Sequence, residues 1–252
     1  MKTLITGASS GLGKEFAKIL VNKYDELVLV GRNKEKLEET KNELLKINDK
    51  ANIKIVSTDL CNKESCIELY NDNKGVDLLV NNAGFGDYGY FDETDLNKDI
   101  SMIETNVLAL HILLKLYLKE MVERNSGHIL NTASVAGFFP GPLMSTYYAT
   151  KNYVVSLSEG IREELKRKKS KVKISILCPG PVKTNFEVSA NVKFNFNGVN
   201  STYIANYAIK HLNRFYIVPQ TKIKLARIGS KLFRKKTTAK ILYKIQAKRK
   251  GA

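Results

Sequence analysis

Two side chains with complementary proton chemistry, Tyr147 and Lys151, lie four residues apart in the segment YYATK. We expect this segment at the start of a helix over residues 144–168, where positions i and i+4 share a face. A nearby ammonium stabilises a phenolate and lowers its pKa from about 10. The spacing therefore predicts a tyrosine that acts as a general acid/base near neutral pH, with Tyr148 facing elsewhere. The alternative is a tyrosine packed beside a surface lysine.

Two further polar residues stand where chemistry is expected. Ser134 follows a strand predicted over 128–132, at the carboxyl edge where parallel sheets bind ligands, so its hydroxyl could hold a substrate oxygen. A turn or cap residue is the alternative. Asn106 lies inside a long helix predicted over 96–124, and asparagine is a poor helix-interior residue. It either lies on a polar face or has a specific role.

A glycine-rich turn, TGASSGLG, joins the first predicted strand to the first helix. Gly7, Gly11 and Gly13 allow a tight turn and the close approach of a pyrophosphate to the helix N-terminus. The second strand ends at Val30 and is followed by Gly31-Arg32-Asn33, without the carboxylate that would hold an NAD ribose. The Arg32 guanidinium suits a 2′-phosphate, with Asn33, Ser9 or Ser10 adding hydrogen bonds. These residues favour NADP, and a solvated surface arginine is the alternative.

Short apolar runs, typical of buried strands, alternate along the sequence with amphipathic stretches of helical period. Apolar runs predict strands over 2–6, 26–30, 53–57, 76–80, 128–132 and 172–177. Amphipathic stretches predict helices over 11–23, 34–47, 62–71, 96–124 and 144–168. This alternation predicts a doubly wound α/β Rossmann fold, a parallel sheet with helices on both faces. We expect one such domain over residues 1–219, followed by a basic helical tail over 220–252.

The motifs, in this order, resemble the short-chain dehydrogenase/reductase family over roughly residues 1–219. The resemblance implies that Tyr147 donates the proton during carbonyl reduction and that Lys151 lowers its pKa and binds the nicotinamide ribose. It implies that Ser134 orients the substrate carbonyl and that Asn106 holds a water linking Lys151 to solvent. The matching residues are TG…GLG at 6–13, Asp59, Asn81-Asn82-Ala83-Gly84, Asn106, Ser134, Tyr147, Lys151 and PGPVKT at 179–184.

The same resemblance implies an NADP-preferring oxidoreductase, with Asp59 at the adenine and Thr184 at the carboxamide. The expected cofactor-binding residues are Gly7, Ser9, Ser10, Gly11, Leu12, Gly13, Arg32, Asn33, Asp59, Leu60, Asn82, Ala83, Gly84, Tyr147, Lys151, Pro179, Gly180, Val182 and Thr184. The substrate is expected to be an apolar carbonyl or alcohol. Its expected pocket wall is Phe85, Phe138, Phe139, Pro140, Leu143, Met144 and the loop over 185–196. A nucleotide-binding regulatory module is the competing function.

Charge is distributed unevenly along the chain. Of the 41 Lys and Arg residues, 15 lie in 188–252, which contains no Asp or Glu, whereas the remainder nearly balances the 25 acidic residues. Leu225, Ile228 and Leu232, and then Ala239, Leu242 and Ile245, follow helical spacing and predict two tail helices, the second capped by Thr237 or Thr238. The tail either covers the pocket with this apolar stripe or contacts an anionic membrane. Nucleic acid is disfavoured because no stacking platform interleaves the charges.

The remaining expectations concern compartment and assembly. The N-terminal apolar run is too short for a signal peptide, and no continuous apolar stretch is long enough for a membrane span, so we expect a cytoplasmic protein, with peripheral membrane contact through the tail as the alternative. The three cysteines form no ligand cluster, and no metal site is expected. Helices 96–124 and 144–168 carry more apolar surface than one sheet face needs, including Leu113, Leu116, Tyr117, Val154, Val155 and Leu157. The family resemblance implies that these helices pair with their counterparts in a homo-oligomer, and burial of the side chains inside the monomer is the alternative.

Overall fold

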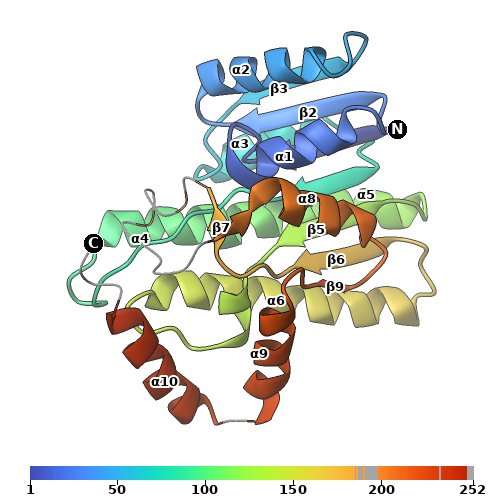
Figure 1. Ribbon diagram of the computed structural model, residues 1–252. Helices are drawn as coiled ribbons and strands as arrows, with labels where there is room; N and C mark the ends of the chain where they lie inside the picture. The colour runs from blue at the N-terminus through green and yellow to red at the C-terminus, as the bar shows by residue number, and fades with distance from the viewer. Residues whose placement is uncertain (185, 187–189, 191–197, 233, 249–252) are drawn as a thin grey trace.

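The apolar runs form one seven-stranded parallel sheet in the computed structural model (Figure 1). The structure describes residues 1–184, 186, 190, 198–232 and 234–248, and only the backbone of residues 230–232. The strand order is β3-β2-β1-β4-β5-β6-β9. The strands are β1 (Lys2–Thr6), β2 (Glu26–Gly31), β3 (Asn52–Ser57), β4 (Leu78–Asn81), β5 (His128–Thr132), β6 (Lys173–Leu177) and β9 (Tyr216–Ile217). A separate pair joins β7 (Val182–Lys183) to β8 (Val199–Asn200).

Helices cover both faces of the sheet, which confirms the predicted doubly wound Rossmann fold. One face carries α1 (Gly11–Leu20), α2 (Lys34–Leu45) and α8 (Ser201–Lys210). The other carries α3 (Lys63–Asn71), α4 (Leu96–Ile103), a π-helical turn (Glu104–Ala109), α5 (Leu110–Glu123) and α6 (Ser145–Arg167). A short 3-10 helix, η2 (Val135–Phe138), follows β5.

The two-sided burial explains why the strands are nearly continuous apolar runs. In β2, Val28 packs into the core on the α5 side, whereas Leu27 and Leu29 pack into the core on the α1 side. The reversal of strand order between β1 and β4 opens a crevice at the carboxyl ends of these strands, where doubly wound folds bind ligands. The glycine turn, Arg32, Asp59, Asn82 and Ser134 each follow a strand that ends at this edge.

The helix over Leu96–Glu123 is long and apolar enough to cross a membrane by length and composition. In this fold it covers the sheet instead, with Leu113, Leu114, Tyr117 and Met121 fully or almost fully buried. The place of this helix in the core explains part of its apolar character, since 39% of its most apolar 18-residue window is buried.

The tail forms two helices, α9 (Thr221–Leu232) and α10 (Lys235–Ala247), which lie below the sheet in Figure 1. Two details of the predicted tail are wrong. Helix α10 begins one turn earlier than expected, so Arg234 is its N-cap residue and neither Thr237 nor Thr238 caps it. The predicted stripe on α9 is exposed at Leu225 and Ile228, because Ile223 and Ala226 face the protein instead.

Candidate active site

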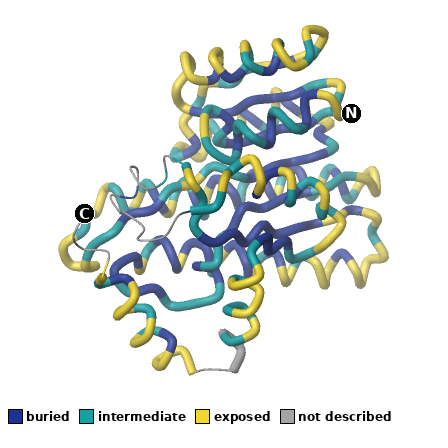
Figure 2. The backbone as a smooth tube through the Cα atoms, in the orientation of Figure 1, coloured by how far each residue is buried: buried dark blue, intermediate teal, exposed yellow. Residues whose placement is uncertain are grey.

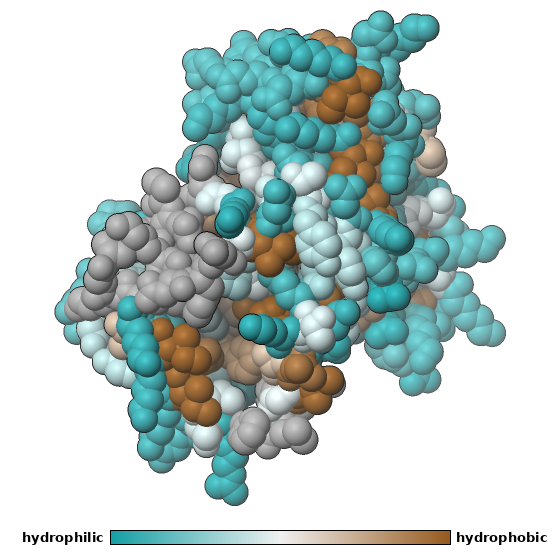
Figure 3. Space-filling view, in the orientation of Figure 1, coloured by the Kyte–Doolittle hydropathy of each residue, from teal (hydrophilic) through white to brown (hydrophobic). Residues whose placement is uncertain are grey.

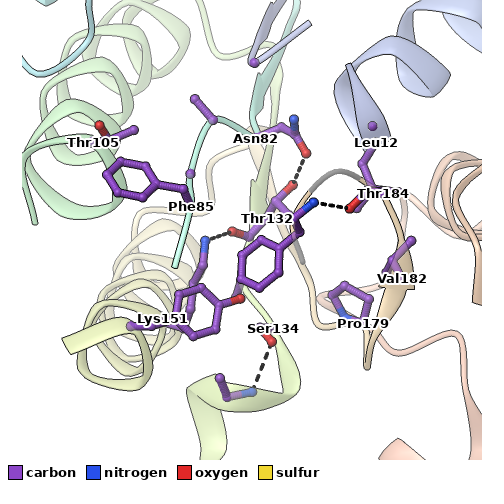
Figure 4. A pocket seen from close by; sticks show the side chains of 18 of the residues that line it. Leu12, Asn82, Phe85, Thr105, Thr132, Ser134, Lys151, Pro179, Val182 and Thr184 are labelled. Atoms are coloured by element: carbon purple, nitrogen blue, oxygen red, sulfur yellow. Dashed lines mark hydrogen bonds between the residues drawn. The ribbon is translucent and has the colours of Figure 1, made fainter. Parts of the chain in front are cut away.

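A cavity of about 580 Å³ lies at the carboxyl ends of β1, β4 and β5. Its wall collects residues from the segments after β1 to β6 and from the start of α6, several of which are labelled in Figure 4, and also from the tail helices. Of the predicted site residues, the wall includes Gly7, Ser9, Ser10, Gly11, Leu12, Arg32, Asp59, Leu60, Asn82, Ala83, Gly84, Ser134, Tyr147, Lys151, Pro179, Gly180, Val182 and Thr184. Segments far apart in the sequence thus meet in one cavity.

The turn between β1 and α1 has the form of a phosphate cradle. Gly7 and Gly11 adopt φ values of +69° and +53°, which side-chain-bearing residues rarely adopt. Ser10 is the N-cap residue of α1, but its side chain makes no capping hydrogen bond. The first-turn N–H groups of α1 are thus not capped by that side chain, and they favour an anion. These residues fit a dinucleotide pyrophosphate.

Gly13 does not line the cavity, although it is part of the same turn. It is buried where α1 crosses the turn, and a Cβ there would lie 2.1 Å from the Gly7 carbonyl oxygen and 2.8 Å from Asn82 Nδ2. Its contribution to a nucleotide site is to let α1 approach the turn closely.

The two residues that follow β2, Arg32 and Asn33, differ in whether they line the cavity. Arg32 is exposed and lines the cavity, with its backbone carbonyl accepting a hydrogen bond from Ser57 Oγ. Asn33 does not line it, because its side chain caps α2 by accepting from the Lys36 amide at 2.7 Å. Asp59 lines the cavity beyond β3 and accepts from the Cys61 amide. The Asn33 side chain is thus shown to cap α2, and its role as a cofactor ligand stays a prediction.

A network of hydrogen bonds fixes the segment after β4. The Thr6 hydroxyl accepts from the amides of Asn82 and Ala83, at 2.9 and 3.0 Å. The Asn82 side chain donates to the Thr6 carbonyl and accepts from the Thr132 hydroxyl. This network ties β1, β4 and β5 together beside the cavity, and Figure 4 shows the bond between Asn82 and Thr132.

Tyr147, Lys151 and Ser134 meet at the centre of the cavity wall. Lys151 Nζ donates to the Thr132 carbonyl at 3.1 Å and lies 5.8 Å from the centroid of the Tyr147 ring. Ser134 Oγ accepts a hydrogen bond from the Ala136 amide, so the predicted cap role of Ser134 is confirmed. The same residue also lines the cavity.

Burial is the largest cause of the pKa shifts of Tyr147 and Lys151. Burial raises the pKa of Tyr147 to about 12, although a hydrogen bond with the Ser134 side chain lowers it in part. Burial lowers the pKa of Lys151 to about 8. The expected lowering of the tyrosine pKa toward neutrality is thus not seen, because the cost of a buried phenolate is the larger effect. Both groups carry their protons at neutral pH.

Asn106 lies in the π-helical turn between α4 and α5 and is fully buried. Its side chain accepts from the Phe85 amide at 3.0 Å and donates to the Phe85 carbonyl at 2.8 Å and to Thr150 Oγ1 at 3.1 Å. It does not line the cavity, but a Cβ on Gly84 would meet both Asn106 Oδ1 and Lys151 Nζ. Asn106 therefore has a specific role, holding the Gly84–Phe85 backbone beside Lys151, and it does not lie on a polar face.

The comparisons with known proteins agree with this geometry. Residues 2–193 match the family model described as short chain dehydrogenase. The chain belongs to the short-chain dehydrogenase family. An oxidoreductase of Staphylococcus aureus is 33% identical over 192 residues, which are 75% of this chain and 80% of that protein.

Two solved short-chain dehydrogenases carry different cofactors. One from Sphingobium yanoikuyae, in complex with NADPH, has a TM-score of 0.81 at 25% identity and covers 92% of this chain and 96% of its own. One from Burkholderia phymatum, in complex with NAD, has a TM-score of 0.81 at 28% identity and covers 90% and 91%. This short-chain dehydrogenase is therefore an oxidoreductase of a family that binds NAD or NADP.

The substrate half of the cavity in this short-chain dehydrogenase differs from the predicted one. Phe85, Phe139 and Met144 line it as expected, whereas Phe138, Pro140 and Leu143 do not. Phe138 instead packs on the main core, beside Tyr216. Of the predicted loop over 185–196, Phe186 lines the cavity, Ala190 is buried, and the rest lies outside the described residues.

Sequence reasoning missed several wall residues of this short-chain dehydrogenase. Tyr148 lines the cavity beside Tyr147, with ring centroids 6.1 Å apart, and does not face elsewhere. Thr132 orients both Asn82 and Lys151, and its position at the end of β5 was the available signal. Ile223, Ala226 and Leu242 bring the tail helices into the wall, so the tail does cover the pocket, but only Leu242 of these three belongs to the predicted stripe.

The predicted oligomer surface also needs correction. Leu113, Tyr117, Val154 and Val155 are buried within the monomer, and Leu116 and Leu157 are partly buried. The large hydrophobic side chains that these helices do expose are Leu96, Ile100, Ile103, Leu108 and Tyr153.

Proposed function

We propose that this protein transfers a hydride between NADP(H) and an organic carbonyl or alcohol, with Tyr147 as general acid/base. The observation that carries the proposal is the meeting of Tyr147, Lys151 and Ser134 in one cavity with an uncapped, glycine-rich helix N-terminus. The nicotinamide, when bound, supplies or accepts the hydride. The remaining steps belong to the chain's own side chains.

In the reductive direction, the Tyr147 hydroxyl donates its proton to the substrate oxygen, and Ser134 Oγ orients that oxygen. The raised pKa of Tyr147, about 12, keeps the proton in place at neutral pH. Lys151, with a pKa of about 8, supplies a positive charge near the ring that stabilises the phenolate after proton transfer. These protonation states favour carbonyl reduction at neutral pH and alcohol oxidation at alkaline pH.

Arg32 supports NADP over NAD. It lines the cavity after β2, in the sequence Gly31-Arg32-Asn33, where an NAD site would place a carboxylate. Its guanidinium can pair with a 2′-phosphate by charge-assisted hydrogen bonds. Both NADPH and NAD complexes occur among the similar structures, so the preference rests on this residue.

The wall beyond the catalytic side chains supports a bulky apolar substrate. Phe85, Phe139, Met144, Phe186 and Leu242 surround the approach to Tyr147 and belong to, or pack against, one hydrophobic cluster with it. Such a wall excludes water and makes few hydrogen bonds, so it suits an aliphatic, aromatic or steroid-like carbonyl better than a sugar.

We also propose that the protein is a homo-oligomer that pairs through α4, α5 and α6. Ile100 and Ile103 are 43% and 46% exposed, and Leu108 and Tyr153 are 39% and 37% exposed. These side chains would be covered in such a pair.

The test is a panel of aliphatic, aromatic and steroidal ketones, assayed by NADPH absorbance and repeated with NADH. We expect turnover with bulky ketones, faster with NADPH than with NADH. Tight NADPH binding without turnover across the whole panel would instead indicate a regulatory nucleotide-binding protein.

A further inference from the structure

The outer faces of the two tail helices carry exposed aliphatic side chains. Leu225 and Ile228 on α9 are 65% and 60% exposed, and Ile241 and Ile245 on α10 are 50% and 41% exposed. The first pair has i,i+3 spacing and the second has i,i+4 spacing, so each pair forms a stripe along its helix. Figure 3 shows apolar side chains over both tail helices, and Figure 2 shows how much of these helices is exposed.

The residues of these stripes do not line the cavity, which other residues of the same helices line. On α9 the opposite face is already packed, through Ile223 and Ala226, whereas on α10 the stripe borders the packed face that contains Leu242 and Gln246. The guanidinium of Arg227 lies 3.4 Å from the centroid of the Tyr216 ring, which attaches α9 to the last strand of the sheet. The α9 stripe therefore faces away from the protein, and the α10 stripe lies along the exposed edge of its packed face.

Helix α10 is attached through two tyrosines of the loop after β4. The Tyr88 hydroxyl donates to the Gln246 carbonyl at 2.8 Å, and the hydroxyls of Tyr90 and Tyr243 are 2.8 Å apart. These contacts fix the rotation of α10 about its axis. Its outward stripe is thus held in a defined orientation.

The stripes are surrounded by positive charge. Lys222 and Lys224 are exposed on α9, Lys240 and Lys244 are exposed on α10, and Lys248 is exposed at the C-cap of α10. The sequence contains no Asp or Glu after Glu187, so neither helix carries a carboxylate of its own to neutralise them. Aliphatic side chains flanked by lysines match the two layers of an anionic bilayer, acyl chains below and phosphate groups above.

We propose that the outer face of α9 and α10, named here the tail surface, binds anionic lipid membranes. It comprises Leu225, Ile228, Ile241 and Ile245 with the five lysines around them. The tail surface is a poor match for a second copy of itself, because that contact would bring the two sets of lysines together. A nucleic acid would pair with the lysines but would leave the four aliphatic side chains in water.

The test is co-sedimentation of the full-length protein with vesicles of phosphatidylserine and phosphatidylcholine, compared with vesicles of phosphatidylcholine alone. We expect binding to the anionic vesicles only. Raising the salt from about 0.1 M to 1 M shortens the screening length from about 10 Å to 3 Å and should release most of the protein.

Two variants separate the apolar and the charged contributions. Leu225→Gln/Ile228→Gln removes aliphatic surface without changing charge, and Lys240→Gln/Lys244→Gln removes charge without changing the stripes. Each should weaken vesicle binding about tenfold or more. The matched controls are Ile47→Gln/Ile67→Gln and Lys34→Gln/Lys36→Gln, which alter exposed residues on α2, on α3 and just after α2, and should bind as the unmodified protein does.

Three results would overturn the proposal: equal binding to both kinds of vesicle, binding that the controls weaken as much as the tail variants do, or a tight complex with duplex DNA that depends on the lysine pair and not on the aliphatic pair. NADPH binding by each variant checks that it is folded. Vesicle binding requires no turnover, so its outcome is independent of the proposed reaction.

Discussion

Replacing Gly13 by alanine tests how α1 and the phosphate turn are packed. A Cβ at this position would lie 2.1 Å from the Gly7 carbonyl oxygen and 2.7 Å from its carbonyl carbon. Both are backbone atoms, so no side chain can rotate away. Contacts this short must open by about 1 Å, which moves α1 away from the turn.

The magnitude follows from two opposing effects. Overpacking costs about 1–3 kcal/mol, and a backbone clash belongs at the upper end of that range. Alanine in a helix recovers about 1 kcal/mol relative to glycine. We therefore expect Gly13→Ala to lower the free energy of unfolding by about 2 kcal/mol. The shifted turn should also raise the Kd for NADPH at least about tenfold, equivalent to about 1.4 kcal/mol.

Gly160→Ala is the matched control, because Gly160 is an exposed glycine in α6 and its added Cβ would meet nothing within 4 Å. It should raise the free energy of unfolding by about 0.5–1 kcal/mol and leave NADPH binding unchanged. Urea unfolding followed by far-ultraviolet circular dichroism measures stability, and isothermal titration calorimetry measures binding. If the two variants are equally stable and bind NADPH equally well, the close packing of α1 on the turn is refuted.

Three further variants probe other parts of the structure. Arg32→Ala should weaken NADPH binding about ten- to hundredfold, the loss of about 1.5–3 kcal/mol of charge-assisted contact, and leave NADH binding nearly unchanged in calorimetry; equal losses for both would contradict the NADP assignment. Burial lowers the pKa of His128 to about 4. The unfolded chain therefore takes up a proton between about pH 6.5 and 4 that the folded chain excludes, and stability should fall by about 2–3 kcal/mol over this window. Urea unfolding at both pH values should show a smaller fall for His128→Gln, and an unchanged fall would exclude His128 as its source. Ile100→Glu/Ile103→Glu should convert the oligomer to a monomer in light scattering, and an unchanged mass would place the interface elsewhere.

Local sequence was enough to predict the sheet and the central pair of the site. The run ELVLV is apolar at every position but the first, as a strand buried on both faces requires, and it forms β2. The four-residue spacing of Tyr147 and Lys151 brought both side chains into one cavity, because it is the spacing of one helix face.

Features that depend on tertiary contacts were not predicted from the sequence. The π-helical turn at Asn106 accompanies hydrogen bonds to Phe85, 21 residues away, and no helix-period pattern reports such a partner. Asn33 could equally cap a helix or bind a ribose phosphate, and only the structure shows that it caps α2. The pKa of Tyr147 depends on its burial, which spacing alone does not give.

The tail shows the same limit for packing. Leu225 and Ile228 have the helical spacing of a buried stripe, yet Ile223 and Ala226 on the other side of α9 contact the cavity. The short helix carries apolar residues on both faces, so periodicity does not decide which face packs. Which face of α9 packs depends on the shape and chemistry of the protein surface against which the helix lies.

The central claim is that Tyr147 supplies the proton for carbonyl reduction in the cavity that binds the nucleotide. The most direct measurement compares kcat of the unmodified protein and Tyr147→Phe on the best ketone, with the Kd for NADPH measured on both. The account predicts a fall in kcat of about 10²–10⁴-fold with a nearly unchanged Kd, because the phenyl ring keeps its packing and only the proton donor is lost. A Tyr147→Phe variant that keeps the full kcat would contradict it.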